Sequence, residues 1–177
     1  MERTLVLIKP DAIERKLAGE IIKRFEQDFE ILAMKIVKVS RELAEKHYRA
    51  TEEQLIGMGK KTLESSSLED VMKIFRTKDP LEIGKKLREW LIEFLTNKKV
   101  IAIVLAGEKA VERVRKMVGH TNPAKAEKGT IRGDFGQDSI EKANLEKRCV
   151  RNLVHASGSL SEAEYEIKVW FKDEEII

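Results

Sequence analysis

The sequence has almost no cysteine, no long hydrophobic run and little net charge. Cys149 is the only cysteine in 177 residues, which excludes an internal disulfide and indicates a reducing compartment. The longest apolar stretches have the length of a strand, so the sequence predicts neither a membrane span nor a secretory signal. A formal net charge of +3 gives no evidence for nucleic acid or an anionic membrane as a partner. We therefore expect a cytoplasmic protein.

What is present is typical of a globular protein with a heavily charged surface. Hydrophobic residues make up 42% of the chain and charged residues 37%. This length suffices to bury a proper core. We expect residues 1–177 to form a single domain, with a helical insertion at about 50–84.

Regular elements follow from hydrophobic periodicity. Continuous apolar runs predict buried strands, and apolar residues at helical spacing predict amphipathic helices. Strands are expected at 4–8, 31–39, 100–106 and 153–154, and helices at 19–29, 41–49, 80–97, 110–118, 139–147 and from Ser159 onward.

Two segments are less regular. In 50–84, Gly57 and Gly59 are expected to break any helix that begins near Thr51, while Ser67 and Asp79 have the features of helix N-caps. Residues 119–135 have no periodicity and are expected to form a long loop, which an ordered core rarely keeps without a use.

This order of elements predicts an α+β fold with a four-stranded antiparallel sheet of the ferredoxin-like kind. The first and third strands are apolar throughout, although an antiparallel sheet with one wet face alternates. We therefore expect helices on one face and a second subunit over part of the other.

The strongest candidate for chemistry is His155, where an apolar strand ends. Ser159 and Glu162 have the spacing of a capping box, so a helix begins just after the histidine. Glu166 lies two turns into that helix and can reach back to hold one ring nitrogen, which leaves the other nucleophilic. The alternative is a satisfied structural histidine at a strand end.

Further polar residues at the ends of elements suit a polyphosphate, because phosphoryl transfer depends on positioning and charge neutralisation. They are Lys9, Tyr48, Arg115, Thr121, Arg132 and Asn152. Each alone has an ordinary explanation as a solvated or turn-forming residue, and the spacing does not show that they converge.

Several blocks together resemble the nucleoside diphosphate kinase family. In chain order they are Lys9-Pro10-Asp11, Gly19-Glu20-Ile21-Ile22, His47-Tyr48, Thr121-Asn122-Pro123, Gly129-Thr130-Ile131-Arg132-Gly133-Asp134-Phe135 and Asn152-Leu153-Val154-His155-Ala156-Ser157. They follow the family's order and run from the first strand almost to the end of the sequence.

The resemblance implies an enzyme that moves the γ-phosphoryl group of a nucleoside triphosphate to a nucleoside diphosphate through a phosphohistidine on His155. It implies that Glu166, helped by Ser157, orients the imidazole and that Tyr48 lies beside the transferred group. Nucleotide binding would fall to Lys9 and Asn152 at the ribose and nearby phosphate oxygens, and to Arg115, Thr121 and Arg132 at the β- and γ-phosphates. Mg²⁺ would arrive on the nucleotide phosphates, with no dedicated protein ligands. The family forms homo-oligomers, commonly hexamers and sometimes tetramers.

The sequence departs from the family in three places. Gly158 stands where the family usually has aspartate, and Leu87 stands where a phenylalanine normally stacks on the base. Phe75 or Trp90 could replace that ring, although both fit a helix core better. A longer connection after Phe135 carries Cys149 near the expected base pocket, where a small buried residue is favoured over a reactive thiol. These departures leave an alternative open, a catalytically impaired nucleotide-binding or interaction module of the same fold.

Overall fold

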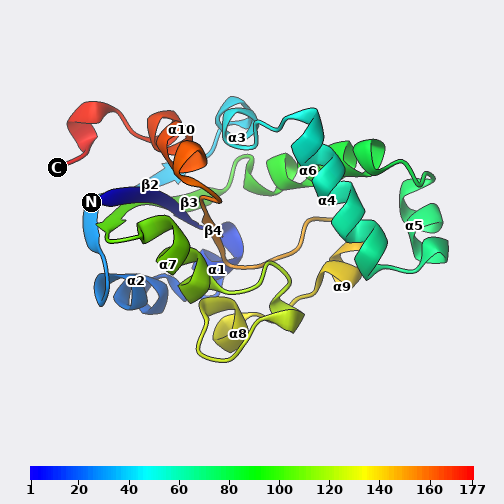
Figure 1. Cartoon of the computed structure of the whole chain (residues 1–177), viewed down its shortest axis with the longest axis horizontal. Coiled ribbons are helices and arrows are strands. Elements are labelled where there is room, and N and C mark those ends of the chain that lie inside the picture. The colour runs from blue at the N-terminus through cyan, green and yellow to red at the C-terminus, as the bar shows by residue number, and fades with distance from the viewer.

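A four-stranded antiparallel sheet lies at the centre of the computed structural model, which describes residues 1–177 (Figure 1). The strands are β1 (Glu2–Ile8), β2 (Glu30–Lys38), β3 (Lys99–Gly107) and β4 (Val154–Ala156). Their order is β2-β3-β1-β4, and every neighbouring pair is antiparallel. This is the predicted α+β, ferredoxin-like architecture.

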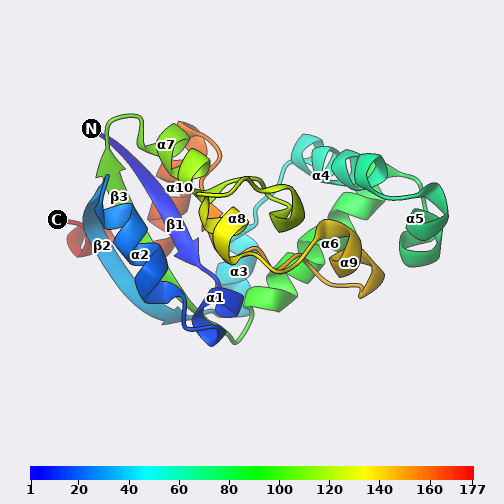
Figure 2. The same cartoon turned by 90° about the horizontal axis from the view of Figure 1, so that it is seen from below.

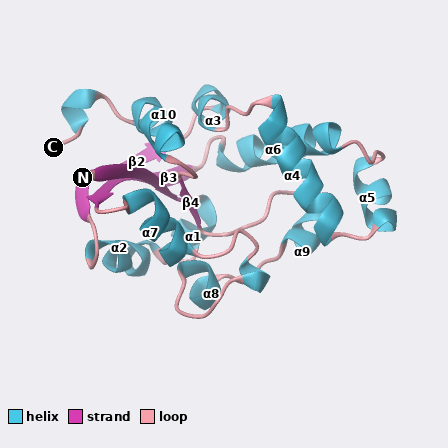
Figure 3. Ribbon diagram, in the orientation of Figure 1, coloured by secondary structure: helices cyan, strands magenta, loops and turns pink.

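Ten α-helices surround or extend the sheet (Figure 3). They are α1 (Pro10–Glu14), α2 (Ala18–Glu26), α3 (Arg41–His47), α4 (Glu52–Ser65), α5 (Leu68–Phe75), α6 (Pro80–Leu95), α7 (Ala110–Val118), α8 (Ile131–Phe135), α9 (Ile140–Leu145) and α10 (Leu160–Trp170), with short 3₁₀ turns η1 (Pro123–Lys125) and η2 (Asp173–Glu175). None of these helices is long and apolar enough to cross a membrane.

Both faces of the sheet are covered by helices of the same chain, so the expectation of helices on one face only is wrong, and the apolar strands need no second subunit to explain them. Alternate residues of β1 and β3 point to opposite faces. On one face they pack against α2 and α7, as Phe25 and Val114 illustrate. On the other they pack against α3, α6 and α10, as Leu95 and Trp170 illustrate (Figure 1). The central strands are therefore apolar throughout because each contributes to two cores.

Residues 50–84 form α4, α5 and the start of α6, and the expected break at Gly57 and Gly59 does not occur. Helix α4 runs through both glycines from a capping box made by Thr51 and Gln54. A Cβ on Gly59 would overlap the backbone of Pro80 on α6, and one on Gly84 would overlap the backbone of Leu55 on α4. The glycines allow α4 and α6 to pack closely, which outweighs their poor helix propensity. Figure 2 shows α4, α5 and α9 at one end of the molecule, away from the sheet.

Gly59→Ala should lower the free energy of unfolding by about 1–3 kcal/mol, because an added methyl group overpacks the contact with Pro80. Gly57→Ala is the matched control, since nothing lies within 4 Å of its Cβ position. That variant should be neutral or more stable by up to about 1 kcal/mol, because alanine is the better helix former. Urea unfolding of both variants measures the difference. Equal stabilities would contradict the close packing of α4 on α6.

The segment 119–135, expected to be a loop, contains η1 and α8. Thr130 caps α8 by accepting a hydrogen bond from the backbone N–H of Gly133. Strand β4 is also shifted by one residue, because buried Leu153 adopts a left-handed backbone with φ of 70°. Its backbone N–H donates to Asp11, and its carbonyl accepts from the backbone N–H of Lys9. These bonds hold the start of β4 beside the end of β1, where the candidate site lies.

Candidate active site

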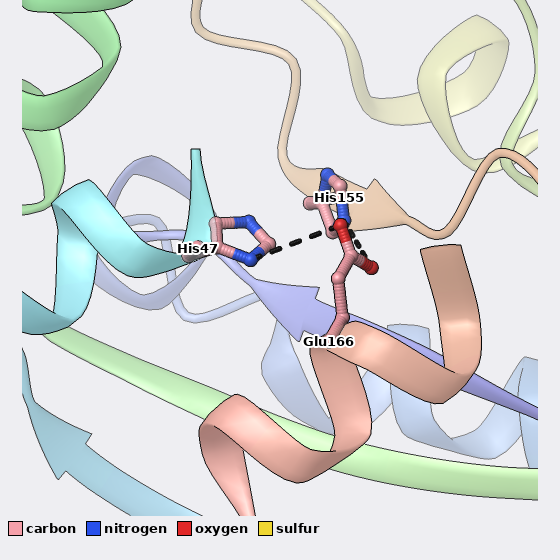
Figure 4. A group of neighbouring side chains, drawn as sticks. All are labelled: His47, His155 and Glu166. Carbon is pink, nitrogen blue, oxygen red and sulfur yellow. Dashed lines mark hydrogen bonds and ion pairs between the residues drawn. The ribbon is translucent and has the colours of Figure 1, made fainter. Parts of the chain in front are cut away.

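His155 lies in β4 opposite Leu7 of β1, and Glu166 of α10 holds one side of its ring (Figure 4). The two carboxylate oxygens of Glu166 lie 2.9 and 3.0 Å from His155 Nε2. An ionised carboxylate only accepts hydrogen bonds, so Nε2 carries the proton and Nδ1 carries the free lone pair. Nδ1 has no hydrogen-bond partner in the protein, and the side chain is 22% exposed.

Ser157 holds the Glu166 carboxylate in place through hydrogen bonds. Its Oγ donates to Glu166 Oε2 at 2.5 Å and accepts from the backbone N–H of Leu5 on β1. Both Ser157 and Glu166 are buried. The carboxylate is therefore fixed relative to the sheet, and it fixes the imidazole in turn.

His47 of α3 packs edge-on against His155, with ring centroids 4.4 Å apart. Trp170 Nε1 donates to His47 Nδ1, which places the His47 proton on Nε2, a buried atom without a partner. Burial, reinforced by His155 and Lys9, lowers the pKa of His47 well below its ordinary value of 6.5. The His47 ring therefore stays neutral at neutral pH, and the Glu166 carboxylate interacts with His155 alone as a charge partner.

The free energy of unfolding should fall with decreasing pH partly because of His47. Below about pH 6.5, His47 is protonated in the unfolded chain but stays neutral in the folded protein. This lowers the free energy of unfolding by up to about 1.4 kcal/mol per pH unit. Above that pH neither state binds the proton, and the effect disappears. We expect His47→Gln, which keeps an acceptor for Trp170, to show a shallower pH dependence of urea unfolding between about pH 7 and 5. Parallel pH profiles of variant and parent would contradict a buried neutral His47.

Together, His47, His155 and Glu166 form a group whose nitrogen and oxygen atoms lie within 4.8 Å of one another. His47 Nδ1 already accepts from Trp170, His155 Nε2 is bonded to Glu166, and Glu166 Oε2 accepts from Ser157. Two imidazoles and one carboxylate also do not match Mg²⁺, which prefers oxygen ligands in octahedral geometry. The arrangement holds the His155 ring in one orientation, with Nε2 bonded to Glu166 and Nδ1 free.

His155 opens onto a cavity of about 490 Å³ between α7, the 119–122 segment, β4 and the insertion. The cavity gathers the polar side chains that the sequence singled out from distant positions. Those lining it are Lys9, Tyr48, Arg115, Thr121, Arg132, Asn152 and His155. The convergence that spacing alone did not establish is therefore present in the fold.

Lys9 and Asn152 form a connected pair on the cavity wall. Lys9 Nζ donates to Asn152 Oδ1 at 2.9 Å, and Asn152 Nδ2 donates to the backbone carbonyl of Thr121 at 2.9 Å. Lys9 is 3% exposed, so its charge acts in a largely desolvated setting. Burial also raises the pKa of Tyr48 well above its ordinary value, so its hydroxyl group keeps its proton.

The two arginines of the cavity differ in what they bind. Arg132 is buried and donates to the carbonyl oxygens of Gly119, Asn152 and Val154, at 2.9, 3.0 and 2.6 Å. Burial lowers the pKa of Arg132 to about 10, which still leaves it charged at neutral pH. Arg115 is exposed and makes no hydrogen bond to the protein. Arg132 thus ties the segments of the site together, while the Arg115 head group is free for a ligand.

Glu162 occupies the space beside Gly158. Ser159 caps α10 as expected, but the Glu162 carboxylate bonds to the backbone N–H of Gly158 at 2.8 Å, so the capping box is not completed at Ser159. A Cβ on Gly158 would meet that carboxylate at 2.5 Å. The turn after His155 is therefore closed by a carboxylate from the next helix, although Gly158 itself has none.

The structure does not bring Leu87 to the cavity. Leu87 is half-buried on α6, and Leu91, one turn later, lines the cavity in its place. The rings of Phe75, in the insertion, and buried Trp90, on α6, lie 5.5 Å apart and pack on each other, and neither lines the cavity. Cys149 is buried, and burial raises the pKa of its thiol, as expected for a small core residue.

Several residues of the cavity were not among the sequence candidates, including Lys61, Leu91, His120 and Glu162. His47, whose ring packs edge-on against that of His155, was also not among the sequence candidates. The amphipathic pattern of α6 marks Leu91 as apolar, and the His47-Tyr48 pair was noticed for its second member only. Nothing local marks Lys61, because its position depends on how α4 packs against α6.

This fold and site are those of a nucleotide phosphotransferase, with an imidazole held by a carboxylate beside a cavity lined by cations. The family model described as nucleoside diphosphate kinase matches residues 2–58 and 80–176. The chain belongs to the nucleoside diphosphate kinase family. Residues 59–79, which carry most of the insertion, lie outside that match.

Several proteins named nucleoside diphosphate kinase are similar to this chain over its full length. The nucleoside diphosphate kinase of Pyrobaculum aerophilum is 46% identical over 181 residues, covering 100% of this chain and 98% of its own. That of Methanocaldococcus jannaschii is 42% identical, covering 99% and 96%. A crystal structure of an NDP kinase from P. aerophilum matches with a TM-score of 0.95 at 45% identity, covering 99% and 98%. The Borrelia burgdorferi enzyme, with bound vanadate and ADP as a transition-state mimic, matches with a TM-score of 0.79 at 33% identity, covering 99% and 90%.

Proposed function

We propose that this enzyme transfers the γ-phosphoryl group from a nucleoside triphosphate to a nucleoside diphosphate by a ping-pong mechanism through a phosphohistidine on His155. The observation that carries the proposal is the state of the His155 ring. Nε2 is held by Glu166, Nδ1 is free of protein partners, and the ring lines the cationic cavity. The B. burgdorferi relative, with ADP and vanadate bound as a transition-state mimic, supports the same chemistry.

In the first half-reaction, His155 Nδ1 attacks the γ-phosphorus and the bond to the β,γ-bridging oxygen breaks. The electron pair of that bond leaves with the nucleoside diphosphate. The ring becomes cationic as the N–P bond forms, and the Glu166 carboxylate at Nε2–H stabilises that charge. The second half-reaction reverses these steps with a different diphosphate as acceptor.

The remaining site residues bind and orient the nucleotide. Arg115, Thr121 and Arg132 would contact the β- and γ-phosphates, and Lys9 with Asn152 the ribose 3′-hydroxyl and nearby oxygens. The Tyr48 hydroxyl would lie beside the transferred group. Mg²⁺ would be held by the nucleotide phosphates and neutralise part of their charge. Leu91 offers an apolar contact for the base without a stacking ring, which fits broad base tolerance.

The alternative, a catalytically impaired module, rested on Gly158 and on the absent phenylalanines. The Glu162 carboxylate beside Gly158 and the presence of Leu91 on the cavity wall weaken both grounds. We further propose that residues 1–177 act as one domain and that the enzyme is a cytoplasmic homo-oligomer, with a hexamer favoured and a tetramer as the alternative. The exposed apolar residues Met34 and Ile36 of edge strand β2 would suit a contact between copies.

The mechanism is tested by separating its half-reactions. With γ-labelled ATP and Mg²⁺ alone, the protein should take up acid-labile label, and adding UDP should move that label to UTP. Initial rates at several ATP and UDP concentrations should give parallel double-reciprocal lines. Intersecting lines without labelled protein would indicate direct transfer and overturn the phosphohistidine mechanism.

A further inference from the structure

The second half of helix α4 lies in the unmatched residues 59–79, and two faces of this helix make different contacts. One face packs on α6 through Leu55 and Gly59. The other carries Gln54, Gly57, Met58 and Lys61, at the i, i+3, i+4 and i+7 spacing of one helical stripe. These four residues line a second cavity of about 320 Å³, which adjoins the first and shares Tyr48, Lys61, Leu91 and Glu162 with it.

A polar contact fixes this stripe to the turn after His155. Gln54 Nε2 donates to Glu162 Oε1 at 3.4 Å, while Glu162 Oε2 accepts from the backbone N–H of Gly158. Lys61 lies two turns beyond Gln54 on the same stripe and lines the cavity of His155. The insertion therefore places a cation in the same cavity as the nucleophile.

The ammonium group of Lys61 has no bonding partner in the protein, in contrast to most cations around it. Lys9 is bonded to Asn152, and Arg132 is bonded to three backbone carbonyls. Lys61 forms neither a hydrogen bond nor an ion pair within the protein, even with Glu162, which shares both cavities with it. Arg115 and Lys61 are thus the two lysine or arginine side chains of the cavity that bond to no group of the protein.

We propose that Lys61 binds phosphate oxygens of the nucleotide, so that the insertion is part of the active site. This inference rests on the proposed function, because it takes the cavity to be the nucleotide site. It assigns the phosphate-binding group to a segment outside the family match, residues 59–79. The ordinary alternative is a solvated surface lysine. Lys61 and its neighbour Lys60 are both exposed, but only Lys61 lines the cavities.

That neighbour supplies the matched control. We expect Lys61→Ala to raise the dissociation constant of Mg²⁺–ADP about tenfold at low salt, the scale of one charge-assisted hydrogen bond. Lys60→Ala should stay within about twofold, since an exposed charge away from the ligand contributes little. Lys61→Arg should retain most of the affinity, and the difference between Lys61→Ala and the parent should shrink as salt is raised. Isothermal titration calorimetry measures all four proteins, and their melting temperatures exclude misfolding.

Equal dissociation constants for Lys61→Ala and Lys60→Ala would overturn the role of Lys61 and leave the proposed function intact. Conversely, a parent protein that binds ADP but forms no phosphohistidine would overturn the proposed function, while the comparison of the two lysine variants would still report on Lys61. A loss of affinity that persists unchanged at high salt, or that Lys61→Arg shares, would contradict a phosphate contact made through charge.

Discussion

His155→Ala is expected to lower phosphoryl transfer by about 10⁴-fold or more, because the variant lacks the atom that accepts the phosphoryl group. No neighbouring side chain can replace it. The nearest imidazole, His47, is buried and uses its Nδ1 to accept from Trp170, and the Ser157 hydroxyl is engaged by Glu166. A coupled assay with ATP and a second diphosphate measures the rate.

The same variant should keep its affinity for Mg²⁺–ADP within a few fold, since the cavity cations do not depend on the ring. The hydrogen bonds of Lys9 and Arg132 run to Asn152, Gly119 and Val154 and bypass the His155 side chain. Appreciable residual transfer by His155→Ala would contradict the assignment of the nucleophile. A loss of ADP binding as large as the loss of rate would indicate that the ring acts mainly in building the site.

Glu166→Gln is expected to lower the rate of phosphoryl transfer by between about 10² and 10⁴-fold with little change in ADP affinity. The glutamine can turn its NH₂ group toward His155 Nε2, which moves the ring proton to Nδ1 and removes the nucleophilic lone pair. Even in the productive tautomer, a neutral amide no longer stabilises the cationic ring of the phosphorylated intermediate.

Glu164→Gln is the matched control on the same helix, because that carboxylate is exposed and does not line the active-site cavity. It should retain parental activity. Rapid-quench measurement of protein phosphorylation by γ-labelled ATP isolates the first half-reaction for both variants. A Glu166→Gln enzyme that phosphorylates itself as fast as Glu164→Gln would contradict the orienting role of the carboxylate.

Local patterns predicted the sheet and the helix caps well, because those features depend on nearby residues. The apolar runs of β1 and β3 gave the central strands, and the caps at Ser67, Asp79 and Ser159 were read from side chains that bond to the first turn of their own helix. Tertiary packing produced the errors. Gly57 and Gly59 looked like helix breakers, but the approach of α4 to Pro80 makes Gly59 necessary where it is.

The residues of the candidate site also divide into those that the sequence predicted and those whose roles depend on tertiary packing. Lys9, Tyr48, Arg115, Thr121, Arg132, Asn152 and His155 were candidates from their residue types and places in the sequence, and the fold brings these seven to one cavity. Leu87 was the exception, because the rotation of α6 against α4 decides which leucine faces the nucleotide, and that rotation has no local signal. The tethering role of Arg132 was equally hidden, since it depends on carbonyls from three separate segments. Lys61 required both the helix and its packing to be known.

We expect the phosphoryl group to be carried on the His155 ring nitrogen that Glu166 leaves free. NMR of ¹⁵N-histidine-labelled enzyme, phosphorylated with ATP and freed of nucleotide, distinguishes the two nitrogens through their ³¹P–¹⁵N couplings. We expect a single phosphohistidine at His155 with phosphorus on Nδ1. Phosphorus on Nε2, or on any other residue, would contradict it.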